Sequence, residues 1–151
     1  MEVPSPPDLE QPVPPAEAGV DDRAGAAAMA EHFFAALDYA RTAGDTRLFE
    51  SLSSPECDYC SSMLQTIESL SDDGGWIQST GFVLRDIRVQ NLENDEGYLV
   101  RFVLEVPDLT VYYGDGTEEL IEAATHPDFA LATRWIGDGF IVDGVDPSTQ
   151  G

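Results

Sequence analysis

Cys57 and Cys60 are the residues whose type and spacing most directly suggest chemistry, and they are the only cysteines in the chain. On a helix they share a stripe with Met63, Leu64 and Ile67, so both thiols are expected to point toward the core. Helical neighbours at this spacing have Cβ atoms about 5–6 Å apart, and a disulfide needs roughly 3.8 Å. Modest distortion would close that gap. We therefore predict a structural disulfide, the form expected in an exported protein.

Two other uses of the cysteine pair stay open. Cys57 would begin a helix, where the helix dipole lowers a thiol pKa and favours redox chemistry. A redox C-x-x-C usually follows a strand of a β-α-β unit, however, and here helices precede it. A zinc site would need two further ligands, for which the chain offers His32 and His126. Neither a metal nor another cofactor is predicted.

A second set of candidates could line a pocket. His32 and Tyr39 lie seven residues apart on one edge of a predicted helix, where they could act as an acid–base group and a hydrogen-bond donor. The aromatic residues that could form apolar walls beside them are Trp76, Tyr98 and Tyr112. The alternative is that the two polar residues border the core and that the aromatic residues belong to it.

Asp86 is the most suggestive of the 29 acidic residues because it lies on the Phe82 and Leu84 face of a predicted strand. A buried carboxyl group there would have a raised pKa and could act as a base. Arg88, two residues further on, could equally form an ion pair with it. The chain has no nucleophile-elbow, phosphate-loop or zinc-protease motif, so we predict no catalytic set.

The charge of the chain argues against polyanionic partners. Seven basic residues, all arginine, stand against 29 acidic ones, which gives a net charge of −22. A nucleic-acid-binding protein needs clustered cations to displace counterions, and these arginines are scattered from Arg23 to Arg134. We therefore expect no nucleic-acid partner. Anionic membrane surfaces are disfavoured for the same reason, and no apolar run is long enough to span a bilayer.

The order of the predicted elements places helices before strands. Residues 1–20 are rich in proline and are expected to form a disordered tether, followed by a single domain over 21–147 and a tail over 148–151. Apolar residues at helical spacing predict a first helix from Arg23 to Ala43, with a cap at Asp21-Asp22 and an end signal at Gly44. Two further helices are predicted to end near Ser51 and Ser71. Strands with a period of two are predicted over 81–91, 98–106, 109–113, 129–136 and 140–145, and 117–124 is ambiguous.

This order favours an α+β fold in which the N-terminal helices pack on a curved antiparallel sheet. Such a sheet can wrap the first helix and leave a cavity between the two.

Several short segments form a recognisable set, which consists of Ala26–Ala30 with Phe33, Leu37-Asp38-Tyr39-Ala40, Thr42-Ala43-Gly44-Asp45, Leu52-Ser53-Ser54-Pro55, Cys57-Asp58-Tyr59-Cys60, Gly74-Gly75 and the ending over 134–142. Together these segments resemble an uncharacterised family of actinobacterial lipoproteins. The resemblance implies a cone of the nuclear transport factor 2-like (cystatin-like) type. It also implies a lipid anchor outside these residues and attachment to the outer side of the cell membrane, in the envelope. It implies no activity.

The leading expectation is non-catalytic binding of a small molecule or a protein partner at the cell envelope. The alternative is an isomerase or dehydratase that acts on a small hydrophobic carbonyl compound, with His32 or Asp86 as base and Tyr39 as hydrogen-bond donor. A third expectation is a structural envelope component that forms a homodimer through an exposed sheet.

Overall fold

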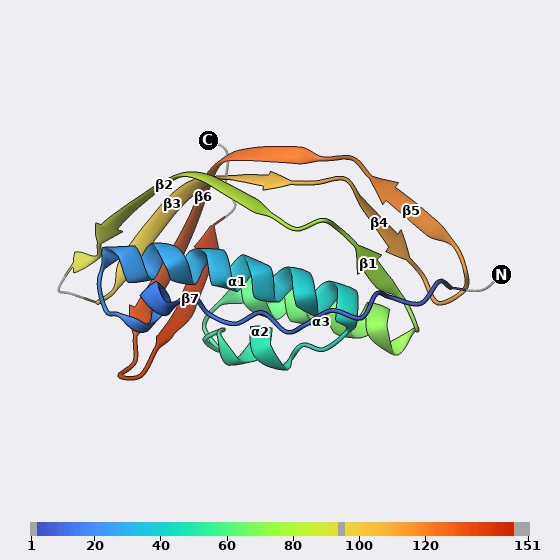
Figure 1. Cartoon of the computed structure of the whole chain (residues 1–151), viewed down its shortest axis with the longest axis horizontal. Helices are drawn as coiled ribbons and strands as arrows, with labels where there is room; N and C mark the ends of the chain where they lie inside the picture. Colours follow the sequence, from blue (N-terminus) through green and yellow to red (C-terminus); the bar gives the residue numbers. More distant parts are fainter. Residues whose placement is uncertain (1–2, 94–95, 147–151) are drawn as a thin grey trace.

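The computed structural model describes residues 3–93 and 96–146 and shows helices followed by antiparallel strands (Figure 1). The predicted α+β class is confirmed. The tail predicted over 148–151 lies outside the described residues. Within the described part of the chain, no helix is both long enough and apolar enough to cross a membrane.

Helix α1 (Arg23–Ala43) forms where the sequence supplies both ends of a helix. The Asp22 carboxylate accepts a hydrogen bond from the Gly25 N–H at 2.7 Å, which satisfies an amide that the first turn leaves unpaired. Gly44 takes up a left-handed φ of 77° and donates its N–H to the Ala40 carbonyl at 2.8 Å. The predicted helix and both end signals are confirmed.

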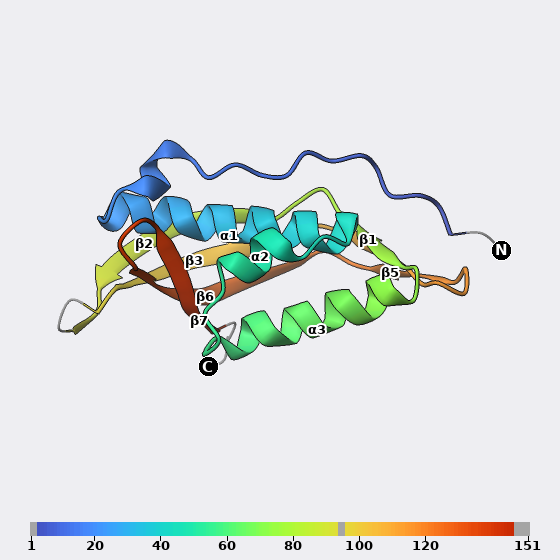
Figure 2. The same cartoon turned by 90° about the horizontal axis from the view of Figure 1, so that it is seen from below.

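Two further helices follow, α2 (Arg47–Ser51) and α3 (Asp58–Asp72). Helix α3 begins at Asp58, and Cys57 supplies its cap. The Cys57 Sγ accepts a hydrogen bond from the Cys60 N–H at 3.2 Å. Figure 1 shows α1 and α3 below the arching strands, and Figure 2 shows the two helices running side by side, so both lie on the same side of the sheets.

The strands form two antiparallel sheets that arch over α1 (Figure 1). One sheet has the order β2-β3-β6-β7, with β2 (Val83–Asn91), β3 (Tyr98–Val106), β6 (Ala124–Trp135) and β7 (Phe140–Asp146). The other has the order β1-β4-β5, with β1 (Trp76–Gln78), β4 (Leu109–Tyr112) and β5 (Glu118–Ile121). The ambiguous 117–124 stretch therefore contains a strand, β1 is an addition to the predicted strands, and β6 begins five residues before the predicted start.

Aromatic side chains fill the space between α1 and the four-stranded sheet. Phe34 of α1 makes edge contacts with Phe102 of β3 and Phe129 of β6, at ring-centroid distances of 5.7 and 5.8 Å. Phe33 and Leu37 are also buried in this cluster. The cavity that the sequence suggested between the first helix and the sheet is therefore occupied by side chains at this end of the molecule.

The proline-rich N-terminal segment lies against the domain. Residues 3–15 run in extended form along α1, on the side away from α3 (Figure 2). The 3-10 helix η1 (Ala16–Gly19) packs on the start of α1 with Ala18 buried. Gly25 permits this approach, because a Cβ atom there would overlap the Val20 carbonyl oxygen. Packing contacts thus extend to residues before 21, and both the domain boundary there and the role of the segment as a tether stay predictions.

Candidate functional site

A disulfide joins Cys57 and Cys60 at the start of α3, so the predicted bridge is confirmed. Both cysteines are fully buried and belong to the hydrophobic core. A redox-active pair needs a sulfur atom that a partner can reach, and neither sulfur atom is exposed here. The bridge therefore acts as a structural link that fixes the first turn of α3.

The structure separates the predicted acid–base candidates. His32 is buried on α1, and this burial lowers its pKa. Tyr39 is half-buried and lines a surface hollow whose lining does not include His32. Asp86 is exposed and has a φ of 54°, because a bulge between Arg85 and Arg88 interrupts the pairing of β2 with β3. Neither His32 nor Asp86 lines either of the two surface grooves beside α1 and α3.

Of the three predicted aromatic walls, only Trp76 and Tyr112 come together. They are cross-strand neighbours on β1 and β4, with ring centroids 4.8 Å apart. The Trp76 indole donates a hydrogen bond to the Pro4 carbonyl at 2.7 Å, which attaches the N-terminal segment to this sheet. Tyr98 lies elsewhere and donates its hydroxyl hydrogen to the Asp21 carboxylate at 2.8 Å. These contacts give the aromatic residues structural roles.

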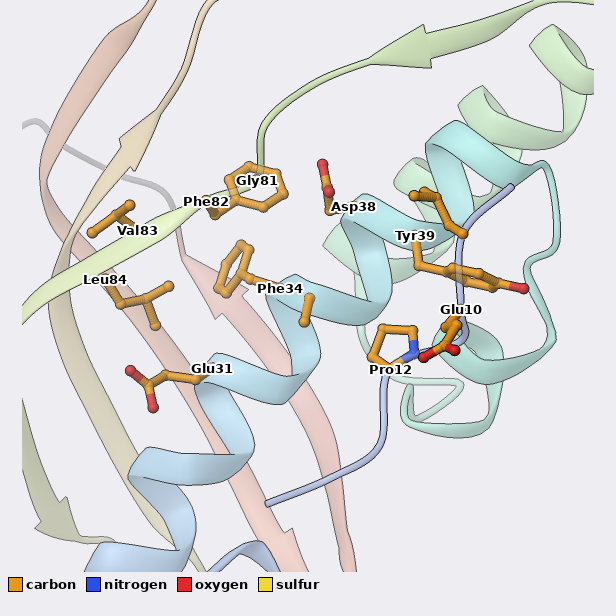
Figure 3. Close-up of a pocket in the computed structure, with 12 residues that line it drawn as sticks. Glu10, Pro12, Glu31, Phe34, Asp38, Tyr39, Gly81, Phe82, Val83 and Leu84 are labelled. Carbon is orange, nitrogen blue, oxygen red and sulfur yellow. The ribbon is translucent and has the colours of Figure 1, made fainter. Parts of the chain in front are cut away.

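An outer groove lies between the N-terminal segment, α1 and the start of β2 (Figure 3). We define the outer groove by its residues, which are Leu9, Glu10, Pro12, Glu31, Phe34, Ala35, Asp38, Tyr39 and the run from Gly81 to Leu84. Its volume is about 480 Å³. Figure 3 shows the Phe34 and Phe82 rings next to each other at its base, with centroids 5.2 Å apart. Tyr39 is the one predicted pocket residue that it contains.

A larger and more apolar groove lies between α3 and the three-stranded sheet, and we call it the α3 groove. Its volume is about 790 Å³. The residues that line it are Arg41, Gln65, Thr66, Ser69, Leu70, Asp73, Ile77, Leu109, Val111, Tyr113 and Ile121.

The walls of the α3 groove follow from strand register and helical spacing. Ile77 pairs with Val111, and Leu109 pairs with Ile121, so these four side chains share one face of the sheet. The opposite wall is the face of α3 that carries Leu70. Leu109 and Val111 are nearly buried, whereas Ile121 at the outer edge is 43% exposed. The result is an apolar surface that opens to solvent.

Arg41 brings a buried positive charge to the α3 groove. Its side chain is only 11% exposed, and its guanidinium lies 4.4 Å from the centre of the Phe82 ring. Nη2 donates hydrogen bonds to the Ser79 hydroxyl at 3.1 Å and to the Asp38 carboxylate at 3.4 Å. Nε is buried and has no acceptor among the described residues. Because Asp38 and Phe82 line the outer groove, Arg41 belongs to the wall between the two grooves.

Burial affects the ionisation of this region. Desolvation lowers the pKa of Arg41, although the nearby Asp38 carboxylate opposes the shift. Burial also raises the pKa of Tyr59 to about 12, with Arg41 opposing that shift. Arg41 therefore brings a largely desolvated guanidinium group to the wall of the α3 groove.

The α3 groove was missed by reasoning from the sequence. One usable signal was the apolar stripe of α3. Leu70 continues the stripe that Met63 and Leu64 begin, but unlike these two residues it does not pack against the core cluster. The partner strand β1 has three residues, too few for a period of two to stand out.

Comparisons with known proteins identify a family and a fold. A family model with the description "Family of unknown function (DUF6318)" matches residues 7–135. A crystal structure from Xanthomonas campestris, named for a calcium/calmodulin dependent protein kinase II association domain, is similar with a TM-score of 0.50 and 11% sequence identity. The similarity covers 91% of this chain and 94% of that one, and at this identity it speaks for the fold alone. No curated protein matches the chain.

Proposed function

We propose a function for this chain, which belongs to the Family of unknown function (DUF6318). The chain binds a small, largely apolar molecule in the α3 groove, without catalysis. The match to the family covers most of the chain and supports the earlier expectation of an uncharacterised family. A family without an assigned activity leaves the function to be argued from the site.

The observation that carries the proposal is the apolar lining of the α3 groove. A volume of about 790 Å³ falls within the range of ligand pockets, which are mostly apolar with few polar groups. Leu70, Ile77 and Val111 supply apolar side chains from both walls. Covering this surface with an apolar ligand would release water at about 25 cal/mol for each Å² removed from solvent.

Binding without catalysis follows from the positions of the candidate bases. His32 and Asp86 line neither groove, so neither could reach a molecule held there. The titratable groups of the α3 groove are Arg41, Asp73 and Tyr113, and none of them is a nucleophile paired with a base. The isomerase or dehydratase alternative therefore gains no support from the geometry.

We also propose a nuclear transport factor 2-like cone and a location outside the cytoplasmic membrane. The sheets that arch over α1 support the cone, and so does the similarity in fold to the association domain. The Cys57–Cys60 disulfide supports an oxidising compartment. Attachment to the envelope through a lipid anchor is part of the same proposal and comes from the resemblance to lipoproteins.

The test uses Nile red, an uncharged dye whose fluorescence rises in apolar surroundings. We expect one dye molecule to bind per chain. Ser69→Trp would place an indole in the α3 groove and should weaken binding at least about tenfold by occupying the site. Ser61→Trp makes the same change at an exposed position of α3 that does not line the groove, and it should bind like the unmodified chain. Equal binding by the two variants would contradict the proposal.

A further inference from the structure

Arg41 is the feature of the α3 groove that apolar binding does not explain. A guanidinium carries five N–H donors, and the hydrogen bonds of Arg41 within the described residues use Nη2 alone. The buried Nε has no acceptor there, and an unsatisfied buried donor lowers stability. The structure therefore retains a buried cation whose hydrogen-bonding capacity is only partly used.

The charge of Arg41 is also incompletely balanced. The Asp38 oxygen lies 3.4 Å from Nη2, which is long for a charge-assisted hydrogen bond. The desolvation of Arg41 outweighs the effect of Asp38, since the net result is a lowered pKa. The Phe82 face adds a cation–π contact but accepts no hydrogen bond in the plane of the guanidinium. Nε itself is covered by protein, so a second carboxylate would have to pair with the outer Nη atoms of the guanidinium.

We propose, on the basis of the binding function above, that the ligand of the α3 groove is an apolar monocarboxylate whose head group pairs with Arg41. The carboxylate oxygens would accept hydrogen bonds from the guanidinium at the inner end of the groove. The apolar body would extend past Leu70, Leu109 and Val111 toward Ile121 at the outer edge. A fatty acid of medium length has this chemistry.

The surrounding acids restrict the ligand to a single negative charge. Asp73 lines the groove, and Tyr113 donates a hydrogen bond at 2.7 Å to Glu119 near the outer edge. A second carboxylate on the ligand would meet these acids and the net charge of −22. Dicarboxylates and polyanions are therefore disfavoured. At physiological salt, repulsion between the ligand and acidic residues more than about 8 Å away is largely screened. One buried ion pair with Arg41 can therefore still form.

The experiment compares decanoate with 1-decanol as competitors for Nile red in 0.15 M salt. The two molecules share a ten-carbon chain and differ in the head group, so the ratio of their affinities isolates the contribution of the carboxylate. We expect decanoate to bind at least about tenfold more tightly than 1-decanol, as a charge-assisted hydrogen bond in a buried site predicts. Decanedioate, with a second carboxylate, should compete less well than decanoate.

The matched variants are Arg41→Gln and Arg47→Gln, which change the net charge equally. Arg47 is exposed and pairs with Asp45, so its replacement should leave the ratio unchanged. Arg41→Gln should reduce the ratio to one or below, because the carboxylate would then lie near Asp38 without a cation beside it. Because this change leaves Asp38 without its cation, Asp38→Asn combined with Arg41→Gln is a second variant that removes both charges. The double variant should give a ratio near one.

The outcomes separate the two proposals. If 1-decanol and decanoate bind the unmodified chain equally and Ser69→Trp abolishes both, apolar binding stands and the monocarboxylate proposal is wrong. A ratio that survives both Arg41 variants would also overturn it, because the carboxylate would then be recognised elsewhere. If neither competitor nor Nile red binds, the proposed function itself fails.

Discussion

The two sheets meet the helices differently. At the four-stranded end, α1 presses aromatic side chains directly onto β3 and β6, and Phe102 is fully buried. At the three-stranded end, α3 leaves part of β4 and β5 uncovered. The exposed fraction of the apolar residues there rises from 8% at Val111 to 43% at Ile121. We call these the closed end and the open end.

This difference assigns stability and binding to separate parts of one domain. Removing a side chain from a closely packed core lowers the free energy of unfolding, whereas a partly covered surface has room for a ligand. The elements that bind ligands are often drawn from the less stable parts of a fold. The Cys57–Cys60 bridge lies in the first turn of α3, whereas the α3 residues that line the groove begin at Gln65.

The largest expected effect tests the closed end. Phe102→Ala should lower the free energy of unfolding by about 3–5 kcal/mol, because it removes a buried ring and leaves a cavity beside Phe34 and Phe129. Val111→Ala, at the open end, removes fewer atoms and should cost about 1 kcal/mol, since solvent can fill the space. Urea denaturation followed by tryptophan fluorescence measures both. Similar losses for the two variants would remove the distinction between the ends.

The second effect concerns the disulfide bridge in the first turn of α3. Replacing both Cys57 and Cys60 with alanine should cost about 2 kcal/mol, because so short a loop restricts the unfolded chain only modestly. The same loss should follow when the unmodified chain is unfolded with a reductant present. A thiol titration on unfolded protein without reductant should find no free thiol. Two free thiols there would show that the bridge does not form in solution.

Local signals in the sequence were enough to predict α1. Asp22 and Gly44 are end signals that act within a few residues, and the helix begins and ends beside them. The same holds for β3, where alternating apolar residues mark the bounds from Tyr98 to Val106. The extension of β6 to Ala124 was missed because Pro127 lies inside it, and proline is uncommon within strands.

The site was harder to predict because it depends on contacts between distant residues. Periodicity places Arg41 near the end of a helix, where an arginine usually faces solvent. Its burial comes from Ser79 and Phe82, which lie about forty residues further along the chain and are brought beside it only by the fold. Asp86 shows the opposite error, because a bulge that the sequence did not reveal turns it to the surface.

The smallest expected effect is a dependence of stability on pH from the closed end. Burial lowers the pKa of His32 in the folded chain below its ordinary value of 6.5. As the pH falls below that value, the unfolded chain takes up a proton before the folded chain does, so folding loses free energy. His32→Gln should therefore flatten the loss of stability below pH 6.5, measured by urea denaturation at several pH values. His126→Gln is the matched control for loss of a histidine, and an identical flattening in that variant would show that His32 is not the group responsible.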